Sequence, residues 1–374
     1  MPWPEMDAMT AKVEFIFDVL GGVGRISPLC RLYGISRKTA YKWLNRYRAS
    51  GLDGLKELSR ARRSQPRRVA RELEEAICGL RKERPTWGSR KIRARLKLDG
   101  WAVPSIRTVE NVLKRHGLNG WSRPDPPARR RFEAEAPNDL WQMDIKGWFT
   151  IKGQGRVYPI TLVDDHSRYL LALKAFCRET GANVQETLME ALKHYGCPGA
   201  ILTDNGPQFR HPTGWGLTRL GVWLAKLGIR HIHTGKRRPT TLGKLERLHE
   251  TLTKDLIRRR RFLDLRDCQR AFDQFRQDYN QIRPHQGIGD LPPASRYRPS
   301  ERRLDQVLVP VHYQPGTLVR KVNGAGIISL GGTSYIISQS LAGERVRLEQ
   351  VAPNLIRVWF LNQLVKELPL KEGP

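Results

Sequence analysis

The chain has 374 residues and is strongly basic, with 66 Lys and Arg against 37 Asp and Glu and a formal net charge of +29. Such an excess favours polyanionic partners, because cations that neutralise phosphates release condensed counterions. The absence of an apolar run of about 18 residues argues against a membrane-bound protein. Five scattered cysteines without a C-x-x-C pair argue against a disulfide or zinc scaffold. We therefore expect a cytoplasmic protein of two or more domains.

Residues 10–60 are predicted to form a helix-turn-helix domain. In SPLCRLYGISRKTAYKWLNRYRASG, Gly34 ends a short amphipathic stretch and Ser36 is a good N-cap for the next helix. The basic face of that helix is typical of a recognition helix in a DNA major groove. Its candidate DNA contacts are Arg37, Lys38, Thr39 and Lys42. The alternative is an ordinary helical hairpin with a solvated basic face.

Residues 61–120 are predicted to form a second, winged-helix-like helix-turn-helix domain. Ser105 is an N-cap candidate, and Ile106 and Val109 are expected to pack inward. The outward side chains, which are candidate DNA contacts, are Arg107, Thr108, Asn111 and Lys114. The basic stretch ELSRARRSQPRRVA between the two domains is either a connector along the phosphate backbone or a disordered linker.

A linker over residues 121–135, rich in Pro and charge, leads to a region with a different pattern. Over residues 136–300, the segments LWQMDIKGWFTI, RVYPITLVDD and RYLLALKAF are predicted strands, followed by alternating helices and strands. This order predicts an α/β domain with a mixed five-stranded sheet and flanking helices. Six short segments over residues 310–370 predict a small all-β barrel.

Three acids stand at the ends or edges of these elements. Asp144 shares a strand face with Lys146, so that it is either a site residue or a surface acid paired with Lys146. Asp204 ends a strand expected in the centre of the sheet, where α/β proteins place ligands, but Asp-Asn-Gly is also a good turn sequence. Glu246 lies in the first turn of a helix, where the helix dipole alone would favour it.

The predicted topology brings the three acids together. The first and fourth strands of the sheet are expected to be adjacent, with the helix packed across their edge. Carboxylate oxygens are the ligands that Mg²⁺ prefers, and two such ions clamp the attacking and leaving oxygens of a phosphoryl transfer. Asp164 and Asp165 are competing acids, and Glu250 is either an auxiliary group or an i, i+4 partner of Lys254 or Arg247.

The motifs WQMDIKG, TDNGPQF, GKLERLHETL and YNQIRPHQG, in this order, strongly resemble the integrase-core DDE transposases of bacterial insertion sequences. That family is related to retroviral integrases and has an RNase H-like fold. The resemblance implies that Asp144, Asp204 and Glu246 are the catalytic, metal-binding triad for two Mg²⁺ or Mn²⁺ ions. It also implies hydrolysis at the 3′ ends of a mobile element and joining of these ends to target DNA.

The chain departs from the family pattern in three ways. Between Asp204 and Glu246 lie 41 residues, more than the roughly 35 of the retroviral relatives, although loop lengths vary. Many relatives carry a basic residue seven positions after the Glu. In this chain that position is Thr253, and Lys254 follows one position later. A zinc-binding His/His/Cys/Cys head is absent, and the two helix-turn-helix domains take its place.

The remaining candidate DNA contacts surround Glu246. The segment TGKRRPTTLGK is either a DNA clamp or a solvated loop, and His249 is either a DNA contact or a half-buried structural histidine. The candidates here are Lys236, Arg237, Arg238, Lys244, Arg247 and His249.

We predict a transposase that acts as a homo-oligomer, at least a dimer, on double-stranded DNA of the element ends and the target. It would associate with the bacterial nucleoid when bound to DNA, with no membrane partner. The alternatives are a DNA-binding regulator with an inactive core and a structure-selective nuclease.

Overall fold

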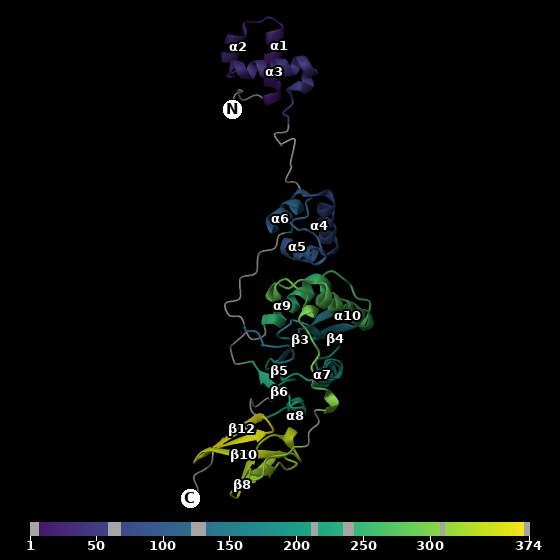
Figure 1. The fold of residues 1–374 in the computed structure, drawn as a ribbon, viewed down its shortest axis with the longest axis vertical. Helices are drawn as coiled ribbons and strands as arrows, with labels where there is room; N and C mark the ends of the chain where they lie inside the picture. Colours follow the sequence, from purple (N-terminus) through teal and green to yellow (C-terminus); the bar gives the residue numbers. More distant parts are fainter. Residues whose placement is uncertain are drawn as a thin grey trace. The chain divides into compact units, whose positions relative to one another are not determined.

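The computed structural model describes residues 7–58, 69–120, 132–210, 216–234, 243–306 and 311–369 (Figure 1). The chain divides into two compact units, residues 1–68 and 69–374. The finer predicted domain boundaries stay predictions. None of the described helices combines the length and apolar character that a membrane crossing requires.

The first unit is a small helical bundle. Its helices are α1 (Ala8–Leu20), α2 (Ile26–Leu32) and α3 (Arg37–Ser50). Phe15 and Ile16 of α1 pack with Trp43 and Leu44 of α3 in one buried cluster. The Ser36 hydroxyl accepts a hydrogen bond from the Thr39 backbone N–H at 3.2 Å, which confirms the predicted cap of α3.

The second unit begins with another three-helix group. Its helices are α4 (Arg71–Glu83), α5 (Ser89–Leu98) and α6 (Ile106–Arg115). Ser105 caps α6 through the Thr108 N–H, as predicted. Val109 is fully buried, whereas Ile106 is 39% exposed. The prediction that Ile106 packs inward is wrong, because this residue opens α6 one turn ahead of the face that meets α4 and α5.

A mixed sheet of six strands forms the centre of this unit. The strands are β1 (Leu140–Ile145), β2 (Phe149–Ile151), β3 (Gly155–Asp164), β4 (Leu170–Phe176), β5 (Ala200–Thr203) and β6 (Arg230–His233). Their order is β2-β3-β1-β5-β6, with β4 also paired to β3. The sheet has one strand more than the predicted five, because the expected first strand breaks after Ile145 and returns as β2.

Helices cover both faces of the sheet (Figure 1). They are α7 (Gly181–Tyr195) and α8 (Arg219–Lys226) on one face, and α9 (Gly243–Leu252) and α10 (Leu265–Gln281) on the other. The sequence predicts one long helix from Gly243, but α9 passes into a π-helical turn at Thr253–Ile257. An ion pair between Asp255 and Arg283 joins this turn to the segment after α10.

The C-terminal region contains six strands and one 3-10 turn. Its strands are β7 (Val319–Lys321), β8 (Ile327–Leu330), β9 (Thr333–Ile336), β10 (Arg345–Ala352), β11 (Leu355–Phe360) and β12 (Gln363–Pro369). They form a four-stranded antiparallel sheet, β12-β11-β10-β7, and a separate β8-β9 hairpin. A closed barrel is therefore not confirmed. Val222 of α8 lies in the same apolar cluster as Val346 and Val358 of this sheet.

Short 3-10 turns complete the described structure. They span Gly51–Leu55, Gln286–Ile288, Pro293–Ser295, Leu304–Gln306 and Gln339–Leu341.

Candidate active site

The register of two parallel strands places Asp144 beside Asp204. β1 pairs with β5 so that Leu140 lies opposite Ala200 and Gln142 opposite Leu202. Two residues further on, the same register puts Asp144 level with Asp204. Because side chains alternate along a strand, the two carboxylates lie on the same face of the sheet as Leu202.

Helix α9 covers this face and carries Glu246. Leu140 and Leu202 share a buried cluster with Leu245 and Leu248 of α9. Glu246 follows Leu245 in the first turn of the helix, and its side chain is exposed. Because the apolar face of α9 packs on the sheet, Glu246 lies near the ends of β1 and β5.

Asp144 is the most perturbed of the three acids. Its side chain is 20% exposed, and its Oδ1 accepts a hydrogen bond from the Ile145 N–H at 2.9 Å. Burial, with the negative charge of Asp204 and to a lesser extent that of Glu246, raises the pKa of Asp144 to about 7. The three carboxylates are thus close enough to repel one another.

This all-oxygen donor set fits a divalent cation such as Mg²⁺, whose charge would offset the repulsion at Asp144. Within the described part of the chain, however, no three His, Cys, Asp or Glu side chains form a group at metal-binding distances. The assignment of the metal ligands is therefore a proposal, and we return to it below.

His249 lies behind Asp144 rather than on the surface. Its Nε2 is 2.8 Å from the Thr161 hydroxyl, and that hydroxyl also donates to the Asp144 carbonyl at 3.1 Å. The Nδ1 atom of His249 is 3.8 Å from Asp144 Oδ2, and its side chain is only 12% exposed. Burial, and then the charge of Lys146, lowers the pKa of His249 to about 3. The structure thus favours a neutral structural histidine over the predicted DNA contact.

A pair of histidines, His231 and His233, lies next to the strand end that carries Asp204. The Thr203 hydroxyl donates to the Asp204 carbonyl at 3.1 Å and lies 3.0 Å from His231 Nε2. Burial, and then the neighbouring His233, lowers the pKa of His231 to about 3. Sequence reasoning missed this pair, although the alternation in IRHIHT places both histidines on one face of β6.

The backbone of the turn after β5 also holds Asp204. The Gly206 N–H donates a hydrogen bond to Asp204 Oδ1 at 3.0 Å. Asp204 therefore forms the turn that the Asp-Asn-Gly sequence predicts and is also a candidate site residue. A Cβ on Gly206 would lie 3.1 Å from the same oxygen, which leaves little room for another residue.

The competing acids lie elsewhere. β3 runs antiparallel to β1, with Asp164 opposite Trp141, so that Asp164 lies at the start of β1 and not at its end. Asp164 accepts hydrogen bonds from the Asn138 and Ser167 N–H groups. The alternative that Asp164 and Asp165 compete for the site of Asp144 is therefore not supported, because antiparallel pairing puts the end of β3 at the start of β1.

Lys244 belongs to the same network. Its ammonium forms an ion pair with the fully buried Asp165, which also accepts hydrogen bonds from the Ala134 N–H and the Gln142 amide. The predicted DNA clamp contact by Lys244 is thus replaced by an internal ion pair. Likewise, Glu250 and Lys254 form the i, i+4 ion pair considered from the sequence.

Most of the other predicted DNA contacts are accessible. On α3 and α6 the exposed side chains are Arg37, Lys38, Lys42, Arg107, Asn111 and Lys114. Thr39 and Thr108 are half-buried, and their N–H groups bind the capping serines. Arg247 is exposed on α9. Lys236, Arg237 and Arg238 lie outside the described residues.

The alternative in which Lys146 pairs with Asp144 is not supported. In the described part of the chain, no acid forms an ion pair with the half-buried Lys146, and the charge that affects its pKa is that of another cation, Arg258. Burial, and then the charge of Arg258, lowers the pKa of Lys146. This side of the acid group is therefore positively charged.

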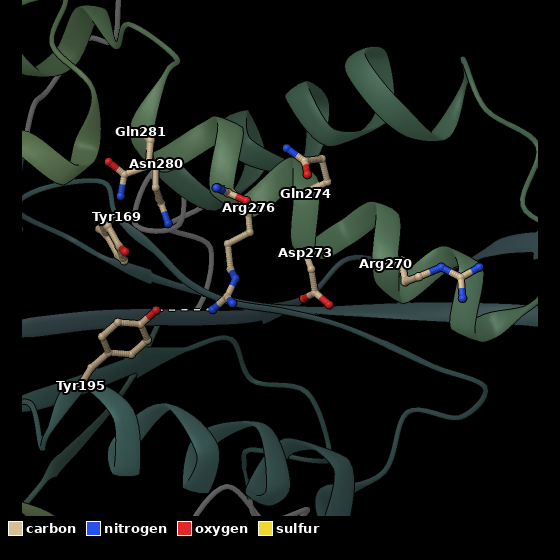
Figure 2. Close-up of a pocket in the computed structure, with 9 residues that line it drawn as sticks. Tyr169, Tyr195, Arg270, Asp273, Gln274, Arg276, Asn280 and Gln281 are labelled. Atoms are coloured by element: carbon tan, nitrogen blue, oxygen red, sulfur yellow. Dashed lines mark hydrogen bonds between the residues drawn. The ribbon is translucent and has the colours of Figure 1, made fainter.

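A cavity of about 430 Å³ lies away from these residues, beside the edge strand β4. Figure 2 shows Arg276 of α10 pointing toward Tyr195 across this space, and its Nη1 is 3.4 Å from the tyrosine hydroxyl. None of the residues predicted from the sequence as catalytic or DNA-binding lines it. The candidate site is thus a sheet edge rather than a deep pocket.

Comparison with known proteins identifies the modules of the chain. Residues 134–239 and 227–293 match two models of the integrase core domain. Residues 11–64 match a helix-turn-helix domain, and residues 39–113 match a homeodomain-like domain. The chain therefore contains an integrase core domain preceded by helix-turn-helix domains.

Several proteins of similar sequence come from mobile elements of bacteria. The chain is 26% identical to a 39.2 kDa protein of the insertion element IS476 from Xanthomonas euvesicatoria, covering 78% of this chain and 83% of that protein. It is 22% identical to the transposase of transposon Tn552 from Staphylococcus aureus, covering 76% of this chain and 65% of that one. These matches support an integrase-core transposase of the insertion-sequence type.

A solved structure of the HTLV-2 integrase catalytic core domain in complex with magnesium is also similar, with 20% identity. That likeness covers 44% of this chain and all of that one, with a TM-score of 0.35.

Proposed function

We propose that the chain binds the ends of a mobile element, cleaves their 3′ ends by hydrolysis and joins them to target DNA by transesterification. Asp144, Asp204 and Glu246 would be the catalytic residues and the ligands of two Mg²⁺ or Mn²⁺ ions. The observation that carries the proposal is the register of β1 with β5, which sets two carboxylates side by side beneath the helix that bears the third.

The bound metal would supply charge stabilisation of the attacking and leaving oxygens at the scissile phosphate. The residues of the chain have separate tasks. Asp144 and Asp204 each accept a backbone hydrogen bond at Oδ1, from Ile145 and Gly206, which fixes the orientation of both carboxylates. Glu246 is exposed and free to close on the site.

Binding and oligomerisation follow from the DNA ends. The exposed cations of α3 and α6 are suited to the double-stranded DNA of the element ends, and two ends must be paired for joining. We therefore propose at least a homodimer on DNA, with the catalytic core acting on both element and target strands.

The test is strand transfer on oligonucleotides bearing the ends of the element, with Mg²⁺ and with EDTA. We expect cleaved and joined products with the unaltered chain and a loss of about 10³-fold or more with Asp204→Asn. Full activity of that variant would remove the site assignment. Cleavage without joining would instead favour a nuclease, and binding without cleavage a regulator.

A further inference from the structure

Beyond the acid group, the hairpin formed by β2 and β3 has one buried and one exposed face. Phe149 and Val157 pack into the core on the first face. On the other face Trp148 is 52% exposed, and the guanidinium of Arg156 lies 4.3 Å from its ring centroid. Arg156 thus lies against the indole of Trp148, and about half of this residue remains accessible to a ligand.

The charge of this segment is uniform. Residues 146–158 contain Lys146, Lys152 and Arg156 and no acid. Lys146 continues the ladder after Asp144, since its N–H donates to the Pro159 carbonyl at 2.9 Å, which puts its side chain on the same face as that of Asp144. An acid-free basic strip thus begins directly beside the carboxylates.

The number of residues between Asp144 and Trp148 limits the distance between them. Trp148 is the fourth residue after Asp144, so that the two are at most about 14 Å apart along an extended chain. Nucleotides of one DNA strand rise about 3.4 Å each along the duplex axis. A strand that places one phosphate at Asp144 therefore reaches Trp148 within about four nucleotides.

We propose that Trp148 and Arg156 form a stacking platform for an unpaired base of DNA near the reacting phosphate, with Lys146 binding a phosphate between the two. An aromatic ring stacks on any base, and a neighbouring arginine strengthens such a contact. The basic segment 146–158, which contains no acid, favours a nucleic acid over an apolar protein segment. This inference rests on the proposed function, because it takes DNA as the ligand beside the carboxylates.

The test is DNA binding by the full-length chain in EDTA, where cleavage does not interfere. Fluorescence anisotropy compares a short blunt duplex with the same duplex carrying an unpaired arm at one end. The unaltered chain should bind the forked DNA more tightly. Trp148→Ala should weaken forked binding by between about 5-fold and 150-fold and leave blunt binding unchanged, whereas Trp148→Phe should retain the preference.

Two further variants check the parts of the site. Lys146→Ala should reduce the slope of log K against log salt on forked DNA by about 0.7, the contribution of one phosphate contact on a single strand. Trp359→Ala is the matched control, because Arg347 lies 5.3 Å from its ring in the C-terminal sheet. An equal loss in this control would overturn the platform.

Crosslinking gives an independent measurement that needs no variant. With 5-iodouracil in the unpaired arm, irradiation should attach the DNA to Trp148, as mapped by mass spectrometry. A fork preference that ignores Trp148, or crosslinks that avoid the hairpin, would overturn the inference and leave the proposed function intact. Conversely, full strand transfer by Asp204→Asn would remove the proposed catalytic site and leave a Trp148-dependent fork preference standing.

Discussion

Replacing Asp144 with Asn should stabilise the metal-free protein while abolishing its activity. The folded state raises the pKa of this carboxyl from 3.8 to about 7, and each tenfold change in proton affinity is worth about 1.4 kcal/mol. The charged carboxylate therefore destabilises the fold by an upper limit of about 4 kcal/mol above about pH 7. Asn keeps the shape of the side chain and removes the charge.

The sign of the pH dependence follows from the same linkage. Below about pH 7 the folded state binds more protons at Asp144 than the unfolded state, so that the free energy of unfolding decreases as pH rises from about 4 to about 7. The advantage of Asp144→Asn should thus be full at about pH 8 and disappear near pH 4. Calorimetry in EDTA should show a melting temperature raised by several degrees at the higher pH.

Asp164→Asn is the control for this prediction. Asp164 is also a buried acid with a raised pKa, caused by burial, but it accepts hydrogen bonds from Asn138 and Ser167. Its replacement should lower the melting temperature, because an amide group would face these donors. Mg²⁺ should stabilise the unaltered chain and not Asp144→Asn. Equal or lower stability of Asp144→Asn in EDTA at about pH 8 would refute the account that burial and charge repulsion destabilise the ionised Asp144.

Three more variants test the surroundings. His249→Ala removes the contact to Thr161. It should lower strand transfer by about 10- to 100-fold and leave the affinity for DNA unchanged. A change in DNA affinity alone would restore the hypothesis that His249 contacts DNA. Lys244→Ala removes the closer of the two cations that pair with the buried Asp165, the other being Arg168 at 3.9 Å, and should lower the free energy of unfolding by up to about 3 kcal/mol. An unaltered melting curve combined with weaker DNA binding would restore the clamp. Ser36→Ala removes the cap of α3 and should destabilise the first unit by about 1 kcal/mol in urea titrations; no change would mean that the cap contributes nothing.

The parts of the site that follow from local patterns could be predicted from the sequence. Strand alternation placed Asp144 on one face, and the predicted pairing of the first and fourth strands is confirmed by the register of β1 with β5. The caps at Ser36 and Ser105 are likewise local, since each serine binds an N–H three residues ahead.

What sequence reasoning missed depends on contacts between distant segments. Lys244 and Asp165 are 79 residues apart, and His249 and Thr161 are 88 apart. A cation or a histidine near a candidate catalytic acid looks the same in the sequence whether it faces DNA or the interior. The π-helical turn after α9 also has no local signal in TKDLI, since Asp255 in that turn pairs with Arg283 beyond α10.

The pairing of β1 with β5 means that hydrogen-bond register, not distance along the chain, sets the geometry of the acids. A count of residues between two acids is therefore a weak criterion for comparing such enzymes, and the long interval between Asp204 and Glu246 needs no compensation at the site. Loops can lengthen freely, whereas deletion of one residue within β5 would turn Asp204 to the opposite face of the sheet. Insertions and deletions are thus tolerated in the loops between the strands but not within the strands that carry Asp144 and Asp204.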